Sequence, residues 1–145
     1  MENDNFNRVN FKKLTLDGIC SYARIISVYD GDTFTAGIPF KDDCYRFSFR
    51  ILNIDAPEIK NDPGNAKKSR NRLIQLMGLS IELSEDLSRK ELINMFMKEK
   101  ILVWIKCGRF EKYGRVLCTV YDYTKQINLG DVLLQENLAN LYNKH

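Results

Sequence analysis

The stretch VYDGDT, residues 28–33, places two carboxylates two residues apart, Asp30 and Asp32, on either side of Gly31. Apolar and β-branched residues surround it, so we expect two antiparallel strands over residues 21–35, with the glycine supplying the bend between them. Carboxylates in such a corner have two common uses. They accept hydrogen bonds from the backbone of their own turn, or they supply oxygen ligands to a cation. VYDGDT by itself leaves both uses open.

Arg50 is a second residue whose position suggests chemistry. Over residues 45–52 the sequence alternates, so that Phe47, Phe49 and Ile51 share one face of the expected strand. Arg50 therefore points away from the aromatic core, toward solvent or a cleft. A guanidinium there would suit an anionic ligand, because its planar donors engage two oxygens at once and keep their charge near neutral pH.

The residue types argue against a structural zinc site. The four cysteines are Cys20, Cys44, Cys107 and Cys118, without a C-x-x-C pair, and the only histidine is His145. Cys107 and Cys118 are able to face each other on paired strands, but in a chain without an export signal we expect four reduced thiols. Hard oxygen ligands with no histidine or cysteine nearby would select calcium or a similar cation.

A short series of elements must position these residues. The pattern predicts the strand pair at 21–35, a loop at 38–43, a strand at 45–52, a helix at 67–77 that Asn65 caps and Gly78 ends, a helix at about 85–98, strands at 101–107 and 116–123, and a helix that begins at Asn128. This order is an α+β arrangement, typical of a five-stranded OB-fold β-barrel with flanking helices.

Length and composition fit one domain of ordinary type. The chain has 145 residues, with 44% hydrophobic and 28% charged residues. We expect a flexible N-terminal arm over residues 1–18 and a single domain over residues 19–145. No apolar run is long enough to cross a membrane and no signal peptide is encoded, so the plainest expectation is an intracellular protein that does not bind membranes. The net charge of +3 identifies no partner.

Four segments in order resemble the staphylococcal nuclease family. They are DGD at 30–32, FRILNIDAPE at 49–58, EKYGR at 111–115 and NLGDVLLQENLA at 128–139. The resemblance runs from about Tyr22 to Leu141 and implies an OB barrel with flanking helices. Residues 78–98 have no counterpart in the compact bacterial enzyme, so we expect a helical insertion there that serves as an extra helix, a partner surface or padding.

The resemblance also implies roles for individual residues. Asp32, Asp55 and the backbone carbonyl of Ala56 would hold a calcium ion, with Asp30 in the outer shell. Arg50 and Arg115 would clamp the scissile phosphate, and Glu58 would be the general base or would order the attacking water. Lys112 and Tyr113 would hold the neighbouring phosphate on the product side. Lys67, Lys68, Arg70 and Arg72 offer a diffuse track for the nucleic-acid backbone, or simply a solvated helix face.

The expected activity is calcium-dependent hydrolysis of DNA and RNA with little sequence preference. By resemblance, the products would carry 3′-phosphate and 5′-hydroxyl ends, and an endonuclease is favoured over an exonuclease. No base-reading constellation is visible, so sequence preference should be weak, and single strands should be favoured where bases can splay and stack. We also expect a monomer. Two alternatives remain: an OB-fold module that binds nucleic acid without cleaving it, and a scaffold that docks a protein through residues 78–98.

Overall fold

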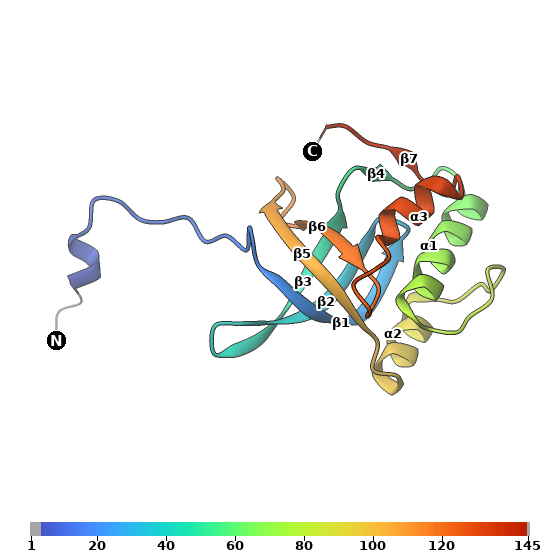
Figure 1. Ribbon diagram of the computed structural model, residues 1–145, viewed down its shortest axis with the longest axis horizontal. Coiled ribbons are helices and arrows are strands. Elements are labelled where there is room, and N and C mark those ends of the chain that lie inside the picture. The colour runs from blue at the N-terminus through green and yellow to red at the C-terminus, as the bar shows by residue number, and fades with distance from the viewer. Residues whose placement is uncertain (1–3, 145) are drawn as a thin grey trace.

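Five strands of the computed structural model, which describes residues 4–144, close into a barrel (Figure 1). They are β1 (Cys20–Asp30), β2 (Thr33–Phe40), β3 (Asp43–Ile51), β5 (Leu102–Phe110) and β6 (Val116–Tyr121). Around the barrel the order is β1-β2-β3-β6-β5, and β5 pairs with β1 to close it. The neighbours are antiparallel except β3 and β6, which run parallel. The α+β, OB-like barrel expected from the sequence is thereby confirmed.

Alternating side chains fill the barrel. On β5, Val103 and Ile105 are fully buried, whereas Lys106, the residue after Ile105, is exposed. Phe34 on β2 and Phe49 on β3 stack with ring centroids 5.4 Å apart. Burying an aromatic side chain of this size is a large apolar contribution, and the stacked geometry adds to it. The predicted core face of β3 is therefore correct.

Strands β2 and β3 form a longer hairpin than the sequence pattern suggested. Residues 38–43 were expected to form a loop, but β2 continues through Pro39 to Phe40 and β3 begins at Asp43. Only Lys41 and Asp42 lie between them, with Lys41 in the left-handed region at φ 57°. The prediction was wrong because it relied on the usual exclusion of proline from strand interiors. In this hairpin Pro39 lies opposite Cys44, in the second pair from the end of the ladder.

Three α-helices among the described residues lie on one side of the barrel: α1 (Pro63–Met77), α2 (Arg89–Lys98) and α3 (Leu129–Gln135) (Figure 1). Helix α1 begins four residues earlier than predicted. Its N-cap is Asp62, whose carboxylate accepts from the backbone N–H of Asn65, and Pro63 occupies the first turn, where a missing N–H costs nothing. The predicted ends are correct: Gly78 closes α1 in a left-handed conformation and Asn128 caps α3.

The segment at 78–98 belongs to the core. Helix α2 begins at Arg89 behind the Ser88 cap, later than the expected start near 85, and buries Leu92 and Phe96 against the barrel. The preceding loop is tied to α1 by the buried side chain of Asn71, whose amide donates to the carbonyls of Leu83 at 2.9 Å and Glu85 at 2.8 Å. Helix α2 is therefore an extra helix packed against the barrel.

A two-stranded sheet lies beside the barrel. It pairs β4 (Ile54–Asp55) with β7 (Asn140–Leu141) in antiparallel register, Asp55 opposite Asn140. The backbone N–H of Tyr142 extends the pairing by donating to the Asn53 carbonyl at 2.8 Å. This pairing fixes the segment that follows Arg50 in the chain.

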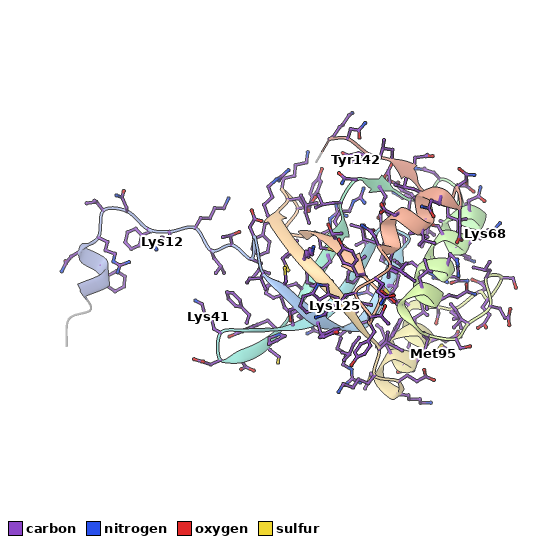
Figure 2. All side chains as sticks on the ribbon, viewed as in Figure 1. Lys12, Lys41, Lys68, Met95, Lys125 and Tyr142 are labelled. Carbon is purple, nitrogen blue, oxygen red and sulfur yellow. The ribbon has the colours of Figure 1, made fainter. Side chains whose placement is uncertain are left out.

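The N-terminal segment projects away from the barrel (Figures 1 and 2). It holds a short 3-10 helix, η1 (Asp4–Asn7), and stays exposed over residues 6–15 until Leu16 is fully buried. Residues 1–3 of the expected arm and His145 lie outside the described residues. Between residues 4 and 144, no helix has the length and apolar character that crossing a membrane requires.

All four cysteines are free. Cys107 and Cys118 do face each other in the β5–β6 register and are buried, whereas Cys20 and Cys44 are exposed. Burial raises the pKa of the Cys107 thiol to about 11 and that of Cys118 well above its usual value, so neither is a reactive thiolate near neutral pH.

Candidate active site

The turn between β1 and β2 presents two nearly buried carboxylates. Asp30 is 8% exposed and Asp32 is 5% exposed. The backbone N–H of Asp32 donates to Asp30 Oδ1 at 3.1 Å, the hydroxyl of Thr33 donates to Asp32 Oδ1 at 2.9 Å, and the backbone N–H of Ala56 donates to Asp32 Oδ2 at 2.8 Å. These bonds fix the Asp32 carboxylate from two separate elements, so its position does not depend on the turn alone.

Gly31 lies in the turn between β1 and β2, as expected. Its backbone is outside the left-handed region in which other residues are strained. Its lack of a side chain matters for another reason: a Cβ atom there would lie 2.0 Å from Ser69 Oγ on α1 and 2.9 Å from Ala56 Cβ. The glycine lets α1 and the segment after β4 close onto the back of the turn.

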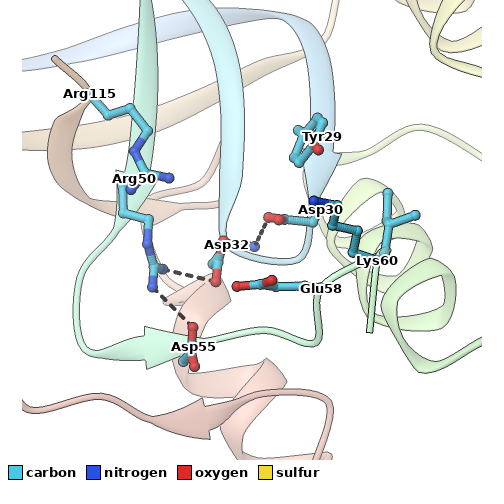
Figure 3. Close-up of a pocket in the computed structure, with 9 residues that line it drawn as sticks. Tyr29, Asp30, Asp32, Arg50, Asp55, Glu58, Lys60 and Arg115 are labelled. Carbon is cyan, nitrogen blue, oxygen red and sulfur yellow. Dashed lines mark hydrogen bonds and ion pairs between the residues drawn. The ribbon is translucent and has the colours of Figure 1, made fainter. Parts of the chain in front are cut away.

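Arg50 connects Asp32 and Asp55 across the site (Figure 3). It pairs in register with Thr33 across β2 and β3 and is only 7% exposed. Its Nη1 lies 3.0 Å from Asp32 Oδ2 and donates to the Ile54 carbonyl at 2.8 Å, and its Nη2 lies 3.4 Å from Asp55 Oδ1. Arg50 points away from the aromatic core as predicted, but into a walled pocket rather than into open solvent.

Asp55 and Glu58 enter the site from the segment after β3. The Asp55 side chain on β4 is 54% exposed, so this carboxylate keeps contact with water. Glu58 follows Pro57 and accepts from the Asn61 side-chain amide at 3.2 Å. Its carboxylate points toward Asp32 (Figure 3). Both are therefore available to a ligand that enters from solvent.

Arg115 is presented by the β5–β6 connection, which Glu111 organises. Both Glu111 oxygens accept from the Arg115 guanidinium at 3.0 Å, and Glu111 Oε1 also accepts from the backbone N–H groups of Tyr113 and Arg115. Gly114 takes a left-handed conformation at φ 85° that closes the turn. Hydrogen bonds from Arg115 hold the pKa of Glu111 below its usual value. Glu111 thus orders the loop while remaining charged.

Two adjoining cavities gather the predicted residues. The first, of about 420 Å³, is lined by Tyr29, Asp30, Asp32, Arg50, Asp55, Glu58, Ile59, Lys60 and Arg115. The second, of about 550 Å³, shares four of these and adds Arg109, Glu111, Lys112, Tyr113, Tyr142 and Lys144. Every residue predicted to bind the metal ion or the phosphates through its side chain, apart from the basic track on α1, therefore lines one of these two cavities. Ala56, predicted to act through its carbonyl, also donates its backbone N–H to Asp32.

The first cavity brings four carboxyl groups together with three cationic side chains: Asp30, Asp32, Asp55 and Glu58 beside Arg50, Lys60 and Arg115. Burial, together with the hydrogen bond and charge of Asp32, raises the pKa of Asp30 from 3.8 to about 8. Arg50 forms ion pairs with both Asp32 and Asp55. Arg115 forms its ion pair with Glu111. Within residues 4–144, no three His, Cys, Asp or Glu side chains lie grouped so as to hold a metal ion. The donors that Asp32, Asp55 and the Ala56 carbonyl offer are all oxygens, a set that fits a hard cation such as calcium.

Two residues that support the site, Glu111 and Tyr142, were not predicted from the sequence. Glu111 lies within the EKYGR segment, but its role depends on the loop conformation. Tyr142 places its ring centroid 5.6 Å from the Arg50 guanidinium carbon, a cation–π contact across 92 residues. Conversely, the basic track on α1 is mostly engaged elsewhere: Arg72 pairs with Glu136, Arg70 is buried against Asn71, and Lys67 pairs with Asp86.

The chain matches no protein-family model, and no curated protein matches it either. The resemblance to the staphylococcal nuclease family therefore rests on the four sequence segments given above.

Proposed function

We propose that this chain is a calcium-dependent nuclease of the staphylococcal nuclease type, which hydrolyses phosphodiester bonds of DNA and RNA with little sequence preference and leaves 3′-phosphate and 5′-hydroxyl ends. One observation carries the proposal: Asp32, Arg50, Asp55, Glu58 and Arg115, from four separate segments, line a single cavity. A structural role alone gives no reason for two arginines and three carboxylates to converge on one concave site.

Phosphodiester hydrolysis requires positive charge on the non-bridging oxygens, donors for the charge that develops, and a group that orients the attacking water. Arg50 and Arg115 provide the donors. Arg50 is held by the Asp32 carboxylate and the Ile54 carbonyl, so it is already oriented before a substrate enters. Arg115 is likewise fixed by Glu111. Such preorganised charge stabilises a transition state more than mobile surface charge does.

Asp32, Asp55 and the Ala56 carbonyl would hold the calcium ion, with Asp30 behind them. When bound, this ion supplies positive charge beside the phosphate and assists ionisation of water. Glu58 lies on the solvent side of Asp32 and is assigned to orient that water and accept its proton. The second cavity offers Lys112 and Tyr113 to the neighbouring phosphate. Tyr113 is 73% exposed, so a base of a single strand can reach its ring.

Digestion of single-stranded DNA and RNA oligomers in calcium, and then in excess chelator, tests the proposal. The expected result is cleavage in calcium alone, with 3′-phosphate ends. Arg115→Ala and Arg50→Ala should each lose about a hundredfold or more in rate, as expected for losing several kcal/mol of transition-state stabilisation. Arg46→Ala is the matched control, because Arg46 is exposed on the same strand as Arg50 and should retain full activity. A loss under threefold at Arg115 would show that the phosphate clamp is misassigned.

Binding without cleavage would instead support the OB-fold binding module. In that case affinity for single strands would fall steeply with salt and would be indifferent to calcium. The protein-docking scaffold has less support, because α2 buries Leu92 and Phe96 in the core of this chain.

A further inference from the structure

A row of aromatic rings crosses the outer face of the barrel on β1, β5 and β6. Tyr22 on β1 lies opposite Trp104 on β5, which in turn lies opposite Tyr121 on β6. The Tyr22 and Trp104 rings meet edge to face with centroids 5.0 Å apart, and Tyr123, just after β6, stacks on Tyr22 at 5.1 Å. Three of the four rings are half-buried, and Tyr123 is 60% exposed. This aromatic row therefore remains open to solvent.

Lysine side chains lie over the aromatic row. Lys125 Nζ is 3.9 Å from the ring centroid of Trp104 and 5.2 Å from that of Tyr22 (Figure 2). Lys106 Nζ is 5.3 Å from the ring centroid of Tyr121. Both lysines are exposed, so their charges are available to a partner while the rings hold them in place.

This part of the barrel surface lacks balancing carboxylates. The three strand segments that carry the row, residues 20–24, 102–106 and 119–121, contain no aspartate or glutamate. The carboxylate of Asp122 accepts hydrogen bonds from a hydroxyl and two backbone N–H groups within residues 124–127, so it serves its own loop. Anchoring of that loop accounts for rings that face one another, but it requires no lysines. Their charge is complementary to an anionic partner.

A cavity of about 210 Å³ lies at one end of the row. It is lined by Tyr123, Met77, Ile101, Leu102 and Lys100. Pockets that hold a whole small molecule usually measure about 300–1,000 Å³, so this one suits one part of a larger ligand. Its side chains are apolar or aromatic except for one cation. That lining matches a flat base whose phosphate lies beside Lys100.

We propose that the aromatic row, its lysines and this cavity form a second contact site for single-stranded nucleic acid. A base stacks on Tyr123 at the mouth of the cavity, and Lys100, Lys106 and Lys125 contact the phosphates. Stacking rings combined with positive charge bind single strands without reading their sequence, because every base has an aromatic face.

The second site is separate from the candidate active site, and the inference extends the proposed function. Arg115 directly precedes β6, whose six residues end at Tyr121. At about 3.3 Å per residue, Tyr121 lies about 20 Å along the strand from Arg115. Only a strand of several nucleotides spans this distance. The second site therefore strengthens the binding of long strands and leaves very short ones unaffected.

Binding of oligothymidine of about 20 nucleotides, longer than the usual site of one OB fold, tests the second site. Fluorescence anisotropy in excess chelator measures affinity without cleavage. Lys125→Glu should weaken binding about tenfold and reduce its salt dependence, because a phosphate contact is lost. Tyr123→Ala should weaken binding about tenfold through the loss of one stacked base. Lys41→Glu is the matched control, because Lys41 also has a left-handed backbone and lies over a ring, that of Phe40. It should bind as the wild type does.

A second charge reversal, Lys106→Glu, tests the row from β5, and melting temperatures verify that each variant is folded. Wild-type affinity in Lys125→Glu, Lys106→Glu and Tyr123→Ala overturns the second site, and so does a wild type that binds no strand. An equal loss in Lys41→Glu also overturns it, since net charge alone then explains the effect.

Failure of the proposed function has a different signature. If the variants lose binding but the wild type cleaves nothing in calcium, the second site stands and the nuclease does not. With an active nuclease, Lys125→Glu should lower kcat/KM for the long oligomer about tenfold and leave cleavage of a dinucleotide unchanged. Equal losses on both substrates would place Lys125 in the candidate active site and overturn a separate second site.

Discussion

Gly31→Ala should destabilise the protein, although glycine-to-alanine changes outside the left-handed region usually help. In the unfolded chain alanine is more restricted than glycine, which favours folding by about 0.4–1 kcal/mol. Against this, the new methyl group would meet Ser69 Oγ at 2.0 Å, Ala56 Cβ at 2.9 Å and Ser69 Cβ at 3.1 Å. Two of these neighbours belong to α1, which is anchored in the core. The turn and the helix must therefore separate.

The size of this effect follows from the contacts. Ordinary carbon contacts begin near 3.4 Å, so the approach to Ser69 Oγ requires a displacement of more than 1 Å. Overpacking of this kind costs about 1–3 kcal/mol, and subtracting the gain of about 0.4–1 kcal/mol from the unfolded state leaves a net loss of up to about 2.6 kcal/mol. For a chain of 145 residues, 1 kcal/mol corresponds to about 3 °C, so the melting temperature should fall by up to about 8 °C.

Thermal unfolding of Gly31→Ala beside Gly64→Ala measures this. Gly64 lies in the first turn of α1 with nothing within 4 Å of its Cβ position, so the same substitution there should raise the melting temperature by about 2 °C. The double variant Gly31→Ala/Ser69→Ala should recover part of the loss, because the shortest contact disappears while that to Ala56 remains. An unchanged or raised melting temperature for Gly31→Ala would refute the close approach of α1 to the turn.

Three further results are expected. A thiol reagent should label only the exposed Cys20 and Cys44 in the native protein and all four cysteines after unfolding, as counted by mass spectrometry. Asn71→Leu should lower the free energy of unfolding by about 2–4 kcal/mol in urea titration, because the amide bonds that hold the loop before α2 are lost. The pKa of Glu111 is lowered by Arg115, so its contribution to stability is present above pH 4.5 and is lost as the pH falls through its folded pKa. The stability difference between wild type and Glu111→Gln should accordingly shrink between pH 5 and pH 3, and a constant difference would contradict the ion pair.

The order and type of the elements were predictable because local patterns determine them. The alternation that places Phe49 and Ile51 inside and Arg50 on the opposite face is a property of any strand. Errors occurred where a boundary depends on neighbours. The start of α1 was placed at Asn65 because asparagine is a good cap, but Asp62 and Pro63 form a better one. Strand β2 continues through Pro39 because pairing with β3 outweighs the preference of proline for loops.

Only the site residues that lie in the recognised sequence segments could be predicted. Arg50, Asp55 and Glu58 lie within ten residues of one another, and resemblance linked them to Asp32 and Arg115. Tyr142, which stacks on Arg50, and Ser69, which packs behind Gly31, become neighbours only through the tertiary fold. Glycine at position 31 was interpreted as a turn residue, because a sequence does not reveal which helix will pack against it.

The pairing of β4 with β7 has a consequence for how the protein is made. Asp55 and the Ile54 carbonyl that holds Arg50 belong to β4, and its strand partner, residues 140–141, is synthesised after every strand of the barrel. Chains begin to fold from the N-terminal side as they emerge from the ribosome. The segment bearing Asp55 therefore gains its partner after the barrel strands have been made. The site is therefore complete only after residues 140–141 have emerged and paired with β4.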